Sequence, residues 1–326
     1  MSTATVESPV SSVTGRSTEF VAAHRDGAHE LGRAVADLVG EPEPLAAALR
    51  AGLTRIGDAE VRDGQTFVAP GIGTTLGIRT PLLKAVGAGF RAATRGDRSA
   101  TLLAIADRLL REDYLEARWL AFGLLERLVR DDPERSWQLM RRAAREAGDW
   151  ITVDTLARAY AWGVLAAPFR WAELEQLVYS PSRWERRLVG STIATIPRAD
   201  RRTGRTSDVA TQGLALLARL IGDAEPDVQK ALSWAYRTLA DVDPDATLAA
   251  LRHEAATAAG RGDGHRAWVI RDTLAKVPPE AAADIRTTLS GVRRSAGAPS
   301  TSEAAAISAR FGDLPDPRHH PEPPLG

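Results

Sequence analysis

The sequence predicts an all-α protein, a right-handed α-solenoid built from HEAT-like two-helix repeats. Apolar residues recur at spacings of three and four in stripes such as 102–110 and 120–128, the period of a helix with one buried face. Turns rich in proline and glycine separate segments of roughly 10 to 17 residues. No convincing run has the two-residue alternation of a strand. Helices joined by short turns are therefore expected throughout the folded part.

These helices are expected to form pairs at a regular distance. The second helix of each successive pair is predicted to begin near Tyr114, Gly148, Pro181, Pro226 and Asp263. This spacing is close to that of HEAT and armadillo repeats, whose units have about 40 to 47 residues. Equivalent helices of a solenoid line the same surface, usually the concave one. Side chains from several second helices are thus expected to converge on one groove.

Composition along the chain predicts one repeat domain between two extensions. Residues 1–42 form an N-terminal extension that is expected to be partly disordered, with a helix between Phe20 and Val39. The repeat domain is expected at 43–295. Residues 296–326 are mostly Ala, Ser, Gly, Pro and charged residues, which predicts a disordered tail. His319 and His320 lie in this tail and are interpreted as solvated rather than as metal ligands.

The bulk composition excludes several classes of protein. The chain has 326 residues and no cysteine, which excludes disulfides, thiolate metal sites and cysteine nucleophiles. The first residues lack the basic start and apolar core of a signal peptide, and no apolar run reaches the roughly 20 residues of a membrane span. We therefore expect a cytoplasmic protein without membrane contact.

Charge and motifs narrow the expected ligands. The formal net charge is zero, whereas nucleic-acid-binding domains are often strongly basic. The segment from Arg183 to Arg237, however, contains ten basic and six acidic residues. The P-loop, the dinucleotide glycine fingerprint, HExxH and GxSxG are missing, and the glycine-rich run 71–77 lacks the Lys-Ser/Thr ending of a phosphate loop. No cofactor and no metal are expected.

One set of residues carries the expected chemistry. Trp150 and Asp154 lie one helical turn apart, so a helix presents both on one face. Trp234 and a basic rim come from later segments. Taken singly, each Trp fits a packed core position and Asp154 a solvated one. Together they suit a cationic sugar-phosphate ligand. The cations assigned to the rim are Arg186, Arg187, Arg198, Arg201, Arg202, Arg205, Lys230 and Arg237.

Four segments in this order resemble a known family. They are Leu76-Gly-Ile-Arg-Thr-Pro81, Glu116-Ala-Arg-Trp-Leu-Ala, Trp150-Ile-Thr-Val-Asp154, and Trp184-Glu-Arg-Arg187 followed by Lys230-Ala-Leu-Ser-Trp-Ala-Tyr-Arg237 with Asp243-Pro. The chain resembles the AlkD-like alkylpurine DNA glycosylases, a HEAT-repeat family of DNA alkylation repair enzymes, over about residues 43 to 277. It departs from the family at Asp63 to Thr75, a glycine-containing stretch without the aromatic-containing helix that the family has there.

The resemblance implies roles for individual residues. Trp150, Asp154 and Trp234 would line the active cleft as the catalytic residues, and Arg187 would bind the DNA backbone near the lesion. The solenoid would hold duplex DNA containing alkylated purines in its concave groove and act as a monomer, associated with the nucleoid when bound. It would act on the sugar from the backbone side, without base flipping.

The chemistry of the substrate agrees with a single carboxylate. Hydrolysis of neutral glycosides usually needs two carboxylates, one of which protonates the leaving group. A purine alkylated on a ring nitrogen is already cationic and leaves as a neutral base. Asp154 alone would then stabilise the oxocarbenium-like sugar and orient water. The expected reaction is hydrolysis of the N-glycosidic bond of 3-alkyladenine or 7-alkylguanine; whether bulky adducts are also substrates is left open.

Two other functions remain open at this level. A non-catalytic DNA-binding solenoid that recognises bent or damaged duplex would keep the arginines and would not need Asp154. A HEAT-type protein scaffold agrees with the zero net charge and predicts no salt-dependent affinity for DNA, in contrast to both DNA-binding functions.

Overall fold

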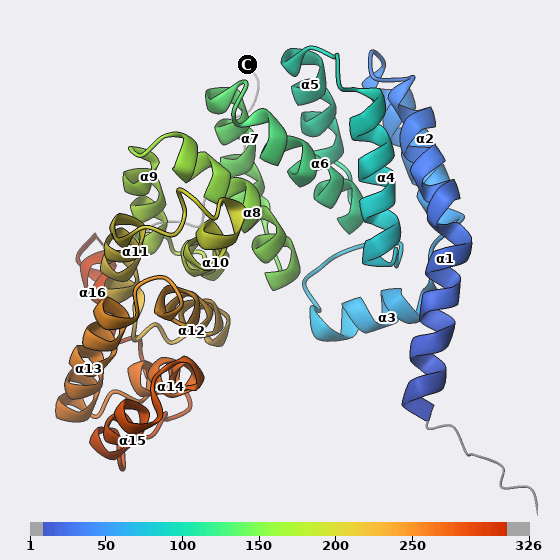
Figure 1. Ribbon diagram of the computed structural model, residues 1–326. Helices are drawn as coiled ribbons and strands as arrows, with labels where there is room; N and C mark the ends of the chain where they lie inside the picture. Colours follow the sequence, from blue (N-terminus) through green and yellow to red (C-terminus); the bar gives the residue numbers. More distant parts are fainter. Residues whose placement is uncertain (1–8, 312–326) are drawn as a thin grey trace, which may run out of the picture. The chain divides into compact units, whose positions relative to one another are not determined.

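The computed structural model describes residues 9–311, and in this part the chain is an all-α helical repeat protein, as predicted (Figure 1). The only β contact found there is an isolated bridge between Thr74 and Tyr114. The chain divides into two compact units, Met1–Leu128 and Val129–Gly326. No helix within 9–311 has both the length and the apolar character that a bilayer crossing requires. His319 and His320 lie outside the described residues.

The first unit contains six α-helices within its described residues. They are α1 (Pro9–Ala36), α2 (Pro42–Thr54), α3 (Ala59–Val68), α4 (Thr80–Ala93), α5 (Ser99–Leu110) and α6 (Leu115–Leu128).

Helix α1 is longer than the helix expected at 20–39, and it is part of the fold rather than a separate extension. It begins at Pro9 and packs along α4. The two backbones touch where glycines meet: a Cβ on Gly89 would lie 2.0 Å from the carbonyl oxygen of His29, and one on Gly32 would lie 2.0 Å from that of Val86. The sequence stripe alone did not show this partner, because α4 lies some 50 residues further along the chain.

A helix also occupies part of the stretch where the sequence was expected to lack one. α3 is capped by the Asp58 carboxylate, which accepts from the backbone N–H groups of Glu60 and Val61. Its end carries Phe67, a residue that is 85% exposed. The expectation of no aromatic-containing helix between 63 and 75 is therefore wrong. Glycine at position 64 did not prevent the helix, because the cap and neighbouring polar contacts hold it.

Two of the segments that carry the family resemblance meet in the first unit. The buried carboxylate of Glu116, on α6, accepts from the backbone N–H groups of Leu76 and Ile78, each at 3.1 Å, and from the hydroxyl of Thr75 at 3.0 Å. A buried carboxylate needs such donors. The Glu that begins this segment thus fixes the loop that leads into α4.

The second unit contains ten α-helices within its described residues. They are α7 (Pro133–Glu146), α8 (Trp150–Ala166), α9 (Arg170–Gln176), α10 (Arg183–Ala199), α11 (Ser207–Leu220), α12 (Pro226–Ala240), α13 (Pro244–Arg261), α14 (Gly264–Thr273), α15 (Pro279–Thr288) and α16 (Glu303–Ser308).

The expected second helices form one row in this unit. α8 packs on α10, α10 on α12 and α12 on α14, while α11 and α13 pack behind them. The predicted start positions are confirmed to within two residues: α6 begins at Leu115, and α8, α10, α12 and α14 begin at Trp150, Arg183, Pro226 and Gly264. Capping explains this accuracy, because side chains such as Asp149 and Asp263 accept from the first free N–H groups of the helix that follows them.

The chain after Ala296 differs from the expected disordered tail as far as it is described. Thr301 donates its backbone N–H to the carbonyl of Gly222 (2.9 Å), and the His265 ring nitrogen Nε2 lies 3.0 Å from the carbonyl oxygen of Ala298. α16 follows and packs on α11. Composition suggested disorder because alanine and serine dominate, but three consecutive alanines after a serine cap are also a good helix start. Residues 312–326 lie outside the described residues.

The cap of α16 gives a first test of this C-terminal contact. Ser302 is buried, and its hydroxyl accepts from the N–H of Ala305 at 3.2 Å. Replacing a serine cap with alanine costs about 1 kcal/mol, so we expect amide exchange in 303–308 to become about fivefold faster in Ser302→Ala. Unchanged exchange would show that the cap does not hold α16 in place.

Candidate functional site

Helix α8 fixes the first two predicted site residues. The Asp149 carboxylate accepts from the backbone N–H of Thr152 at 2.8 Å and from its hydroxyl at 2.6 Å, which sets the first residue of the helix at Trp150. Asp154 follows one turn later. Both side chains are partly exposed, whereas Val153 and Leu156 point into the core. The predicted pairing of an indole and a carboxylate on one helix is therefore present.

The carboxylate of Asp154 is held by α10. Arg187 donates from Nε to Oδ1 (3.1 Å) and from Nη2 to Oδ2 (2.8 Å), and the Ser191 hydroxyl donates to Oδ1 at 2.6 Å. The Asp154 side chain is 22% exposed and that of Arg187 only 6%. Each carboxylate oxygen accepts two hydrogen bonds. Among the described residues Oδ1 has two donors and Oδ2 has one, so Oδ2 keeps room for a further partner.

Arg187 also joins α10 to α12. Its Nη1 donates to the backbone carbonyl of Asp227 at 2.6 Å. The two helices approach closely next to this contact, because a Cβ on Gly190 would lie 2.9 Å from the carbonyl carbon of Ala231. Glycine at 190 thus allows the spacing that lets one guanidinium reach both α8 and α12. Sequence reasoning assigned Arg187 to phosphate; the structure places it first against Asp154.

The aromatic residues lie beside cations of the same row. The Arg187 guanidinium is 5.9 Å from the Trp150 ring centre, and the Arg198 guanidinium is 5.8 Å from the Trp234 ring centre. Both indoles are partly exposed. Trp150, Asp154, Arg187 and Trp234 therefore come from three adjacent helices. An indole face favours positive charge, so these rings suit a ligand that carries or develops such a charge.

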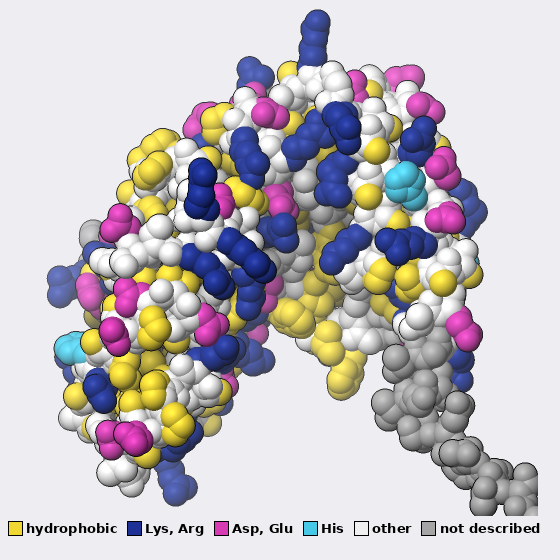
Figure 2. Space-filling model, in the orientation of Figure 1, with side chains coloured by type: hydrophobic (Ala, Val, Ile, Leu, Met, Phe, Trp, Pro, Cys, Tyr) yellow, Lys and Arg dark blue, Asp and Glu magenta, His cyan; other side chains and the backbone are white. Residues whose placement is uncertain are grey.

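Five of the predicted rim cations are exposed and make no ion pair within the described residues. They are Arg198, Arg201, Arg202, Arg205 and Lys230. On the face shown in Figure 2, Lys and Arg side chains gather over α8, α10 and α12.

The loop that carries three of these arginines is folded. Asp200 accepts from the backbone N–H of Arg202 at 2.8 Å, and its carbonyl accepts from Gly204 at 2.9 Å. The N–H of Arg202 is the main reason that the pKa of Asp200 lies below its usual value. The loop therefore presents its cations from a defined turn.

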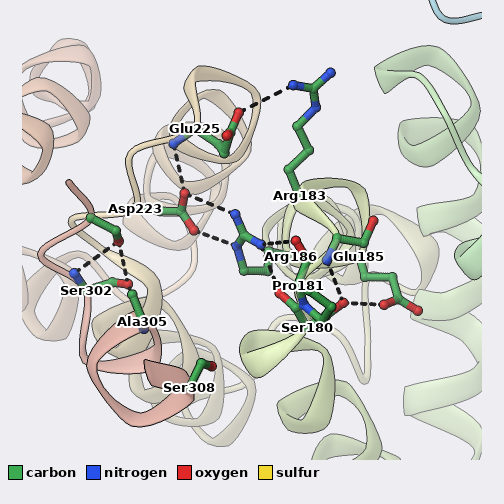
Figure 3. A network of polar contacts seen from close by, with 12 residues as sticks. Ser180, Pro181, Arg183, Glu185, Arg186, Asp223, Glu225, Ser302, Ala305 and Ser308 are labelled. Carbon is green, nitrogen blue, oxygen red and sulfur yellow. Dashed lines mark hydrogen bonds and ion pairs between the residues drawn. The ribbon is translucent and has the colours of Figure 1, made fainter. Parts of the chain in front are cut away.

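Two predicted rim residues are already engaged elsewhere. Arg186 donates to Asp223 (Nε to Oδ2, 2.7 Å) and to the carbonyls of Ser180 and Pro181, as Figure 3 shows. Arg237 is paired with the Asp272 carboxylate. The structure does not bring these two guanidinium groups to Asp154. Each of these two guanidinium groups already pairs with a carboxylate, which lowers the charge it offers to a phosphate.

Sequence reasoning missed further residues on α8. Arg158 and Trp162 continue the series of Trp150 and Asp154 at every fourth position; Arg158 is exposed and Trp162 partly exposed. The guanidinium of Arg130 stacks on Trp162, 3.8 Å from the ring centre. The four-residue spacing was the available signal.

The row of helices and this site define a helical-repeat protein that presents the Asp154 carboxylate among indoles and cations. The chain matches the model of the DNA alkylation repair enzyme family over residues 49–272, more than half of its length, and it belongs to this family. The matched range includes Trp150, Asp154, Arg187 and Trp234. No curated protein is matched by the chain. The family resemblance drawn from the sequence is confirmed, and membership identifies an enzyme of alkylated-DNA repair that binds DNA.

Proposed function

We propose that the protein is a monofunctional DNA glycosylase that hydrolyses the N-glycosidic bond of cationic alkylated purines in duplex DNA and leaves an abasic site. The observation that carries the proposal is the Asp154 carboxylate, held by Arg187 and Ser191 with Oδ2 available. 3-Alkyladenine and 7-alkylguanine are the proposed substrates, without base flipping. Methyl and bulky adducts are both compatible with an attack on the sugar. No cofactor is required.

The proposed reaction begins with departure of the base. The bond between C1′ and the purine nitrogen breaks, and its electron pair goes to the purine, which is already cationic and leaves neutral. Positive charge then develops on the deoxyribose at C1′ and O4′. Because the leaving group needs no proton, a second carboxylate of the kind used on neutral glycosides is unnecessary.

Asp154 is proposed to stabilise that charge and to orient water. Arg187 and Ser191 fix the carboxylate before substrate arrives, so no reorganisation is needed at the moment of reaction. Water adds its hydroxyl to C1′, and its proton passes to Oδ2 and then to solvent. The rings of Trp150 and Trp234 would hold the sugar and favour its developing charge.

The exposed cations are proposed to bind the phosphates on both sides of the lesion. Two of these cations lie on helices of the same row as α8, Arg198 on α10 and Lys230 on α12. The others are the arginines of the 200–206 loop, which follows α10. Arg187, almost fully buried, is proposed to reach a phosphate only through the Nη hydrogens that Asp154 and Asp227 do not use. We propose that the enzyme acts as a cytoplasmic monomer, associated with the nucleoid when bound to DNA.

The direct test is incubation of the purified protein with a duplex that carries a single 7-methylguanine. We expect alkali-labile breaks at that position and release of free 7-methylguanine. A duplex with a bulky N7 adduct, treated in parallel, separates the two substrate classes. Tight, salt-sensitive binding with no excision of either lesion would contradict the glycosylase and favour the non-catalytic DNA-binding solenoid. Absence of DNA binding would favour the alternative function, that of a HEAT-type protein scaffold.

A further inference from the structure

The exposed face of α8 continues beyond the proposed catalytic residues. Its series runs Trp150, Asp154, Arg158 and Trp162. Consecutive members are one turn apart, so Arg158 lies about 6 Å and Trp162 about 12 Å along the helix axis from Asp154. None of the roles described above uses the second half of this series.

The Arg130–Trp162 stack is a preorganised cation. Arg130 is exposed, and its guanidinium lies 3.8 Å from the centre of the indole. Stacking restrains the side chain and uses the face of the guanidinium. The N–H groups at its edge, with which arginine binds phosphate, are not consumed by the stack. Two acidic residues follow Arg130 in the sequence. Asp132 caps α7 and pairs with Arg135, and Asp131 is exposed.

We propose that Arg158 and the Arg130–Trp162 stack form a second phosphate-binding site for DNA, which we call the α8 clamp. It holds the backbone of the damaged strand a few nucleotides from the lesion. Phosphates follow one another every 3.4 Å of duplex axis along one strand. A strand that runs along α8 from Asp154 therefore brings phosphates to Arg158 and Arg130 at about two and about four nucleotides from the lesion.

This inference rests on the proposed function for the position of the lesion, but not for the binding itself. Family membership already implies DNA binding, so affinity can be measured on undamaged duplex without any excision. Failure of the clamp and failure of the glycosylase proposal are thus separate results. The clamp adds binding energy outside the reacting centre and has no part in breaking the bond.

The test uses Arg158→Gln and Arg130→Gln, which remove the charge and keep most of the stem. Arg252→Gln, an exposed cation on α13, is the matched control. We expect each clamp variant to raise the dissociation constant for undamaged duplex about three- to tenfold at 0.1 M salt, and to lower the slope of log affinity against log salt by about 1. The control Arg252→Gln should keep the wild-type affinity, salt slope and single-turnover excision rate.

Neutral methylphosphonates placed two to four nucleotides from the lesion, on either side, locate the contact. The wild-type protein should lose affinity when the neutral group lies about two nucleotides from the lesion on one side, and Arg158→Gln should lose none further there. About four nucleotides away, Arg130→Gln should be the variant that loses none further. Clamp variants with the salt slope and affinity of Arg252→Gln would overturn the proposal. So would an equal effect, in the wild type and Arg158→Gln, of the methylphosphonate about two nucleotides from the lesion. Thermal unfolding of each variant checks that the fold is kept.

Discussion

Asp154→Asn should excise 7-methylguanine about 10³-fold more slowly than the wild-type protein. The variant keeps the size of the side chain but removes its charge. A charge pair near 4 Å at an effective dielectric constant of 20 contributes about 4 kcal/mol, and each 1.36 kcal/mol corresponds to about tenfold in rate. The measurement is the single-turnover rate at saturating enzyme, which separates chemistry from DNA affinity. Affinity for the duplex should change much less than the rate.

Asp227→Asn is the matched control for this variant. It makes the same charge change beside the same guanidinium, since Asp227 Oδ1 lies 4.0 Å from Arg187 Nη1. The hydrogen bond from Arg187 goes to the backbone carbonyl of Asp227 and survives the substitution. We expect an excision rate within a few-fold of wild type. A wild-type rate in Asp154→Asn, or an equal loss in both variants, would remove Asp154 from the chemistry.

The sequence was sufficient to predict the helical repeats because their signals are local. Apolar spacing and capping residues such as Asp149 lie within or beside the helix that they define, and the start of α8 was accordingly predicted to within two residues. The packing of α1 on α4 depends on glycines at 32 and 89, each of which meets the backbone of the other helix only in the folded chain. The contact of 298–302 with Gly222 and His265 is equally remote in sequence.

The candidate site shows the same division. Residue types and spacing on one helix predicted Trp150 and Asp154 together, and the order of the family-like segments added Arg187 and Trp234. The sequence did not show that Arg187 binds the Asp154 carboxylate, because 33 residues separate them. It also gave no means to distinguish Arg186, engaged by Asp223, from the exposed Arg198. Partners of arginine are set by packing between helices.

Arg187→Met should destabilise the second unit by roughly 2–4 kcal/mol and should also slow excision. Removing one member of a buried ion pair typically costs about 3–5 kcal/mol, and the 22% exposure of Asp154 reduces this figure. Within residues 9–311, the variant leaves the Asp154 carboxylate with the Ser191 hydroxyl as its one side-chain donor, and it breaks the link to the Asp227 carbonyl. Seven of the eight Trp residues lie after Val129, so urea unfolding followed by Trp fluorescence reports mainly on this unit.

Arg187→Lys and a double variant show which property of Arg187 matters. Lysine keeps the positive charge but cannot bond both oxygens in a bidentate manner, so it should recover part of the stability and little of the excision rate. In Asp154→Asn combined with Arg187→Met, the stability loss should be smaller than the sum of the single losses, because neither charge is left unpaired. Strictly additive losses would show that the two side chains are not coupled, and full activity in Arg187→Lys would show that charge alone positions Asp154.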